Sequence, residues 1–93
     1  MNVQQLETYC EAQLRATENA YRAKAYQNVD AFIHREHPSK ERMLTELAET
    51  ATKAQQTIEM IQQAGYALAM LDSYQAQEDV CEELFELLLT SSR

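Results

Sequence analysis

The chain has 93 residues, enough for one small domain and too few for two. Its formal net charge of -7 at pH 7 makes direct contact with nucleic acid or an anionic membrane unfavourable. Two cysteines are too few for a disulfide scaffold, and the sequence has no run of about 18 apolar residues that could span a membrane.

The N-terminal stretch has neither the basic start nor the apolar run of a signal peptide, so we expect a cytoplasmic protein. One Gly and one Pro, among abundant Ala, Gln, Glu and Leu, leave little to interrupt a helix. The sequence therefore predicts an all-α fold, organised as a single helical domain over residues 1–93.

A first long helix is predicted from about residue 3 to about residue 36. Pro38 ends it, because Pro disfavours helix in the residue before it and has no backbone donor. Apolar residues recur at steps of three, four or seven along this stretch, which is typical of one face of an amphipathic helix. They are Val3, Leu6, Cys10, Leu14, Tyr21, Ala25, Val29 and Phe32.

A second helix is predicted from about residue 39 to about residue 71, where the apolar residues alternate more strictly between steps of three and four. We expect the first helix to pack on this seam, folded back as a long antiparallel hairpin with coiled-coil-like packing. The seam consists of Leu44, Leu47, Ala51, Ala54, Ile58, Ile61, Gly65 and Leu68.

A shorter third helix is predicted from about residue 73 to about residue 89. Asp72 is the expected N-cap, with Gln75 reaching back to complete a capping box. Two alternatives stay open. In one, the second and third helices are a single helix with a kink, and in the other the break lies at Gly65.

The third helix has an unusually wide apolar arc of roughly 200° at 100° per residue. A two-helix hairpin covers only one side of such an arc, so we expect oligomerisation or a partner protein to cover the rest. Tyrosine is frequent at interfaces, and we assign Tyr74, or else Tyr66, to the same surface. The predicted partner-binding residues are Tyr74, Val80, Leu84, Phe85, Leu87, Leu88 and Leu89.

The other side of this helix is acidic. Residues 72–93 contain six acidic residues and one basic residue, which concentrates the excess charge of the chain here. The natural counterpart is a basic surface on another protein, and the alternative is a solvated face that keeps an apolar helix soluble. The predicted acidic face consists of Glu78, Asp79, Glu82, Glu83 and Glu86.

Two functions are compatible with these features. The first is a non-catalytic helical protein-protein interaction module, such as an adaptor, a small chaperone or an inhibitor, that binds through the apolar face of the C-terminal helix. The second is an inhibitor that mimics nucleic acid and occupies the basic groove of a nucleic-acid-binding protein. Salt distinguishes them, because apolar binding survives about 0.5 M salt and charge mimicry weakens steeply.

The sequence predicts no enzyme and no cofactor, since it has no Gly-rich phosphate loop, no His-Glu-x-x-His motif and no evident acid pair in an apolar setting. His34 and His37 have the spacing of a metal-binding pair, but we interpret them, with Glu36, as residues of a turn and predict no metal. Cys10 and Cys81 both lie on apolar faces and are interpreted as core residues.

Overall fold

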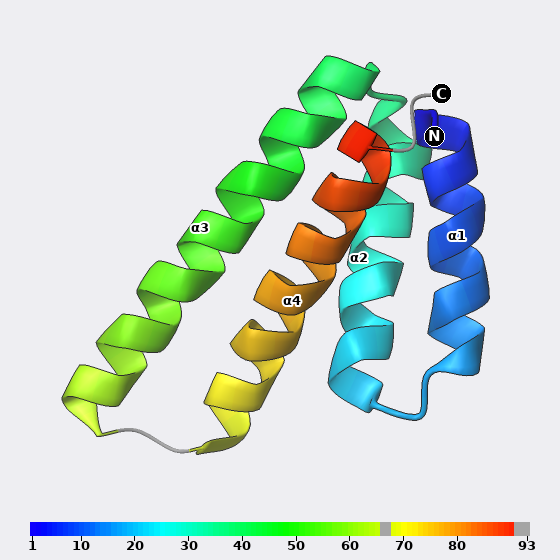
Figure 1. Cartoon of the computed structure of the whole chain (residues 1–93). Coiled ribbons are helices and arrows are strands. Elements are labelled where there is room, and N and C mark those ends of the chain that lie inside the picture. Colours follow the sequence, from blue (N-terminus) through cyan, green and yellow to red (C-terminus); the bar gives the residue numbers. More distant parts are fainter. Residues whose placement is uncertain (66–67, 91–93) are drawn as a thin grey trace.

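The computed structural model describes residues 1–65 and 68–90, which form four α-helices and no strand (Figure 1). The predicted all-α class is confirmed, and the predicted number of three helices is wrong. The helices are α1 (Val3–Ala16), α2 (Ala20–Glu36), α3 (Lys40–Ala64) and α4 (Leu68–Thr90).

The first difference from the prediction is a break at residues 17–19, inside the stretch predicted as one helix over 3–36. Asn19 has an extended backbone, and its side-chain Oδ1 accepts hydrogen bonds from the backbone N–H groups of Tyr21 and Arg22, at 2.9 and 3.2 Å. The hydroxyl oxygen of Thr17 accepts from the N–H of Asn19 at 3.3 Å. Side-chain caps therefore replace helical hydrogen bonds here, without Gly or Pro.

The second difference lies at Gly65, where the predicted helix over 39–71 ends early. Gly65 has a φ of 72°, in the left-handed region, and its N–H donates back to the carbonyl groups at the end of α3. Because α4 begins at Leu68, Asp72 lies inside α4 and is not its N-cap. The alternative break at Gly65 is thus confirmed, whereas the predicted start at residue 73 and the continuous helix are wrong. Tyr66 lies outside the described residues.

The turn around Pro38 agrees with the prediction. α2 ends at Glu36, and His37 follows with a positive φ of 45°. Ser39 caps α3, since its hydroxyl oxygen accepts from the N–H of Arg42 at 3.1 Å. The chain therefore reverses direction within three residues.

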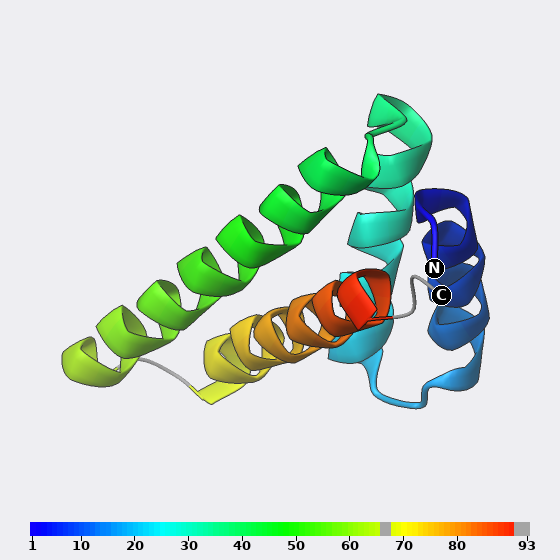
Figure 2. The same ribbon diagram turned by 45° about the horizontal axis from the view of Figure 1, so that its top comes forward.

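α4 lies between α3 on one side and α1 and α2 on the other (Figures 1 and 2). The extensive packing of α3 is with α4, and that of α1 is with α2. The apolar seam of α3 was therefore predicted correctly as a packing face, but its partner is α4 and not the first predicted helix.

The main core forms where the second half of α4 meets α1, α2 and the first half of α3. Its largest fully buried side chains include Leu6, Tyr26, Met43, Leu84 and Leu88. Beyond this core, residues 54–64 of α3 continue along α4 as a pair of helices, which we call the paired end (Figure 2). Its buried residues on α3 are Ala54, Ile58 and Ile61.

Candidate protein-binding surface

Three of the predicted partner-binding residues lie in the core. Val80, Leu84 and Leu88 are each 0% exposed. The break at residues 17–19 gives the fold one helix more than predicted, so the wide apolar arc of α4 is covered by α1, α2 and α3 together. The chain thus buries the middle of the arc by itself. These three residues therefore need no partner protein to cover them.

The other four predicted residues stay partly accessible. Tyr74, Phe85 and Leu87 are half-buried, and Leu89 is 48% exposed. Phe85 and Leu87 both pack against the edge of the core. At 100° per residue, Phe85 and Leu89 lie about 40° apart on the helix, whereas Leu87 lies on the far side of the buried residues. Phe85 and Leu89 are therefore the pair that remains available together.

A shallow groove runs beside Phe85, where α3 and α4 pack together. Its volume is about 320 Å³. The α3 wall is low because it is built from Ala48 and Ala51, whose side chains are small. We call this feature the α3–α4 groove, and it is lined by Leu47, Ala48, Ala51, Cys81, Glu82, Phe85 and Glu86.

The acidic residues of α4 fall into three settings. Glu82 and Glu86 are exposed at the margin of the α3–α4 groove, and neither carboxylate has an ion pair within residues 1–65 and 68–90. Glu78 and Asp79 accept hydrogen bonds from the side-chain amide of Gln75, at 3.0 and 3.1 Å. These four are accessible to a partner.

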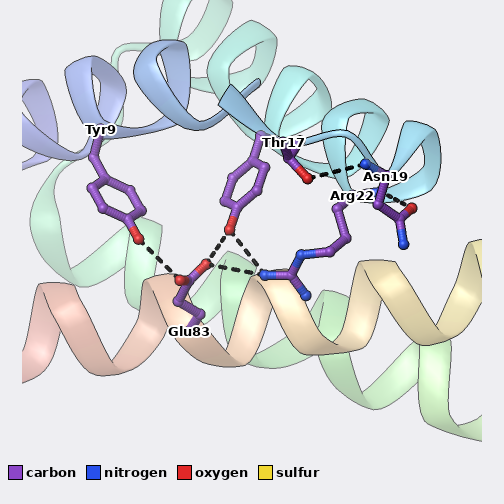
Figure 3. Close-up of polar contacts among 6 residues, drawn as sticks. Tyr9, Thr17, Asn19, Arg22 and Glu83 are labelled. Atoms are coloured by element: carbon purple, nitrogen blue, oxygen red, sulfur yellow. Dashed lines mark hydrogen bonds and ion pairs between the residues drawn. The ribbon is translucent and has the colours of Figure 1, made fainter. Parts of the chain in front are cut away.

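Glu83 lies about 160° around α4 from Phe85 and joins three helices (Figure 3). Its carboxylate accepts hydrogen bonds from the hydroxyl groups of Tyr9 on α1, at 2.9 Å, and of Tyr26 on α2. Arg22 donates to the hydroxyl oxygen of Tyr26 at 3.0 Å, and its guanidinium lies 3.7 Å from Glu83. The five predicted acidic residues therefore do not form one face, because Glu83 is part of the packing between α4 and the α1–α2 pair.

This network changes the acidity of the two phenols. Burial and the hydrogen bond to the Glu83 carboxylate raise the pKa of Tyr9 to about 12. The same causes raise the pKa of Tyr26, although the nearby Arg22 opposes them. Both hydroxyl groups therefore stay protonated at neutral pH, which lets them donate to Glu83.

Both cysteines are buried free thiols, as the sequence predicted. Burial is the main cause that raises the pKa of Cys10 and of Cys81 to about 12. A thiol with so high a pKa carries almost no thiolate at neutral pH and is a poor nucleophile. Cys81 therefore contributes apolar surface to the floor of the α3–α4 groove.

The two histidines lie at the turn between α2 and α3. Their ring centroids are 6.4 Å apart, and Nδ1 of His34 lies 3.7 Å from a carboxylate oxygen of Glu7. Glu36, between them in sequence, accepts from the guanidinium of Arg42 at 2.9 Å, and the hydrogen bonds from Arg42 and Arg35 lower its pKa. Glu36 thus ties the end of α2 to the start of α3.

One cluster with the spacing of a cation site was not predicted. Glu7 and Glu11 of α1 and Asp30 of α2 each offer a carboxylate oxygen within 4.8 Å of the others. The sequence does not reveal it, because a single helix over 3–36 would keep Asp30 far from the two glutamates. These residues could hold a divalent cation, but acidic side chains gather on many helical surfaces, so the spacing alone assigns no metal.

Another hollow, of about 340 Å³, lies between α2, α3 and α4. Its lining contains both a basic residue, Arg35, and an acidic residue, Glu46, together with apolar side chains such as Phe32 and Met43. Its charge therefore favours neither a basic nor an acidic partner, in contrast to the α3–α4 groove.

No protein-family model, curated protein or solved structure matched this chain when it was compared with each of them. Within the described ranges, no helix combines the length and the apolar character that crossing a membrane requires.

Proposed function

We propose that this protein is a non-catalytic protein-protein interaction module, an adaptor, small chaperone or inhibitor, that binds its partner in the α3–α4 groove. One observation carries the proposal. Phe85 and Leu89, the accessible pair on α4, lie on the side of the helix that borders the groove. An aromatic side chain at the edge of an apolar depression is a common anchor of protein interfaces.

Phe85 and Leu89 form an apolar centre of modest size beside the groove. Complete burial of a Phe or Leu side chain contributes roughly 1.5 to 3 kcal/mol, and both Phe85 and Leu89 are already partly buried. Covering them further, together with Ala48 and Ala51, contributes on the order of 2 to 3 kcal/mol. The remaining affinity of a stable complex then comes from contacts around this centre.

The chemistry of the groove supports a binding role and not a catalytic one. The Cys81 thiol has a pKa of about 12 because of its burial, so it is no nucleophile at neutral pH. Glu82 and Glu86 are exposed carboxylates, without the apolar setting that turns a carboxyl group into a general acid. The cytoplasmic location is part of the proposal, since free thiols persist in a reducing compartment.

Mimicry of nucleic acid has less support. It needs the five residues of the predicted acidic face as one row of charges, and Glu83 accepts hydrogen bonds from Tyr9 and Tyr26. A second copy of the chain is a competing occupant of the α3–α4 groove, and the same experiment tests it.

Site-specific photo-crosslinking in cells of the native host tests the proposal. A photoreactive amino acid at Ala48, on the α3 wall, is expected to form an adduct with a different protein. The same amino acid at Gln27, exposed on α2, is the matched control and should form none. The adduct from position 48 should largely disappear in Phe85→Ser and in Leu89→Ser, provided that circular dichroism shows both variants folded.

Three results would contradict the proposal. Equal adducts from positions 48 and 27 would show that the groove is not selective. An adduct with the mass of two copies of this chain would assign the groove to self-association. Adducts that persist in both folded variants would show that Phe85 and Leu89 do not contact the partner.

A further inference from the structure

We infer that the segment held in the α3–α4 groove is an amphipathic helix whose apolar stripe is flanked by Lys or Arg residues. The inference rests on the proposed function and adds the chemistry of the partner. It follows from the shape of the groove and from the charges along its α4 margin and beyond the ends of its α3 wall.

The shape favours a helix over an extended strand. Both walls of the groove are α-helices, whose backbone donors and acceptors are used within the helices themselves. A strand that lay there would leave its own N–H and C=O groups without backbone partners, whereas a helix brings its hydrogen bonds with it. The small side chains of Ala48 and Ala51 let another helix approach α3 closely.

The margin on α4 is acidic. Glu78, Glu82 and Glu86 recur every four residues, so they form a row along one side of the helix, next to Phe85 and Leu89. No Lys or Arg lies between Leu68 and Thr90. A partner at this margin therefore meets negative charge only.

The α3 side carries carboxylates as well. Glu41 and Glu59 are exposed and, at 100° per residue, lie within about 20° of Ala48 around the helix axis. At a rise of 1.5 Å per residue they lie about 10 and 16 Å from Ala48 along the axis, beyond the two ends of the α3 wall. The basic residues of α3, which are Lys40, Arg42 and Lys53, lie about 80°, 120° and 140° around the helix from Ala48. Carboxylates thus lie along the α4 margin and beyond both ends of the α3 wall, and the complementary helix has an apolar stripe flanked by basic residues.

The two kinds of contact have different roles. An exposed ion pair contributes roughly 0.2 to 1 kcal/mol, so the carboxylates at the margins mainly select the partner and speed its approach. The apolar stripe against Phe85, Leu89 and the two alanines contributes on the order of 2 to 3 kcal/mol, more than any single ion pair. Salt should therefore weaken binding moderately without abolishing it.

Three synthetic peptides test the inference with the whole 93-residue chain. The first is a designed helix with a Leu stripe flanked by Lys and Arg. The second has the same stripe flanked by Glu, and the third has the composition of the first in an order that destroys the stripe. Fluorescence anisotropy is expected to show that the first peptide binds at least about tenfold more tightly than either of the others.

Variants of the chain locate the binding. Phe85→Ser should weaken the binding of the first peptide by about tenfold or more. The double variant Glu82→Gln with Glu86→Gln should weaken it by about threefold to tenfold and make the affinity less dependent on salt. The matched control is Glu18→Gln with Asp72→Asn, which changes the net charge equally at exposed positions outside the lining of the groove and should leave the affinity unchanged.

The outcomes separate this inference from the proposed function. If photo-crosslinking at Ala48 identifies a partner but the three peptides bind equally, the inference is wrong and the proposed function stands. If the shuffled peptide binds as tightly as the striped one, or if the control variant weakens binding as much as Glu82→Gln with Glu86→Gln, the contact is a general attraction to negative charge. That result would overturn the inference.

Discussion

The two ends of α3 are built on the same apolar spacing, yet they are covered to different degrees. At the core end, Met43 and Leu47 belong to a cluster that includes α1, α2 and α4. At the paired end, Ile58 and Ile61 pack along α4 and are 9% and 6% exposed, whereas Met43 and Leu47 are each 1% exposed. A regular seam therefore shows that a helix is covered on that face, but not how many helices cover it.

A similar contrast separates two adjacent acidic residues of α4. The carboxylate of Glu83 accepts hydrogen bonds from the phenol hydroxyl groups of Tyr9 and Tyr26. It also lies near the guanidinium of Arg22, so it joins three helices. Glu82 is exposed at the margin of the α3–α4 groove. Neighbouring side chains on a helix point about 100° apart. Glu83 therefore contributes to the packing of the fold, whereas Glu82 is available to a partner.

The largest predicted effect compares the main core with the paired end. Leu84→Ala should lower the free energy of unfolding by about 4 kcal/mol, because the fully buried site is enclosed by several helices and cannot collapse. Ile58→Ala at the paired end should cost only about 2 kcal/mol, since two helices can close the gap. Urea denaturation followed by circular dichroism measures both. Equal losses of unfolding free energy in the two variants would contradict the difference between the main core and the paired end.

The next prediction compares the adjacent acids. Glu83→Ala should destabilise the fold by about 2 kcal/mol, because the hydroxyl groups of Tyr9 and Tyr26 lose their acceptor. Glu82→Ala is the matched control and should change stability by less than about 0.5 kcal/mol. Chemical denaturation of the two variants tests this. A loss at Glu82 as large as that at Glu83 would contradict the assignment of roles.

Substitutions at Gly65 test whether α3 ends at this residue. Gly65→Ala should destabilise by about 1 kcal/mol, because the left-handed backbone is strained for a residue with a Cβ. Nothing lies within 4 Å of an added Cβ, so the loss is conformational and not steric. Gly65→Asn should therefore cost less than Gly65→Ala, since Asn tolerates this conformation. Thermal melts compare the two variants with the wild type. A Gly65→Ala variant that is more stable than the wild type would show that Gly65 is not a left-handed cap of α3.

The smallest predicted effect is the dependence of stability on alkaline pH. The pKa of Tyr9 is about 12 in the folded chain and 10.0 in the reference state, so the folded state holds this proton more tightly. The stabilising contribution is complete below about pH 10 and is lost as the pH rises toward 12. Tyr9→Phe should therefore be less stable than the wild type by about 1 kcal/mol at pH 7, and the difference should shrink above pH 10.

Urea titrations of both proteins at a series of pH values measure this difference. A gap between wild type and Tyr9→Phe that stays constant from pH 7 to the alkaline range would show that the hydrogen bond to Glu83 does not depend on the protonated phenol.

The sequence was sufficient to predict the helical class, the turn at Pro38 and the apolar faces of the helices. It did not reveal the break at residues 17–19, because Ala16, Glu18 and Ala20 favour helix and the apolar spacing continues from Leu14 to Tyr21. Asn19, a good N-cap residue, was the available signal.

That missed break also misdirected the interpretation of the site. With one helix too few, Leu84 and Leu88 had nothing in the chain to cover them, and they were assigned to a partner. Their burial depends on α1 folding back beside α2, which is a tertiary arrangement that periodicity cannot report. Phe85 and Leu89, at the edge of the same arc, are the part of the prediction that the structure leaves accessible.

Chemical-shift mapping tests the central claim most directly. Labelled protein is titrated with the Leu-striped basic peptide, and amide shifts are followed along the chain. We predict that the largest changes fall at Ala48 to Thr52 of α3 and at Glu82 to Leu89 of α4, with little change at the exposed face of α2 around Gln27. Changes centred on α1 and α2, or spread evenly over every acidic residue, would contradict the assignment of the α3–α4 groove as the binding surface.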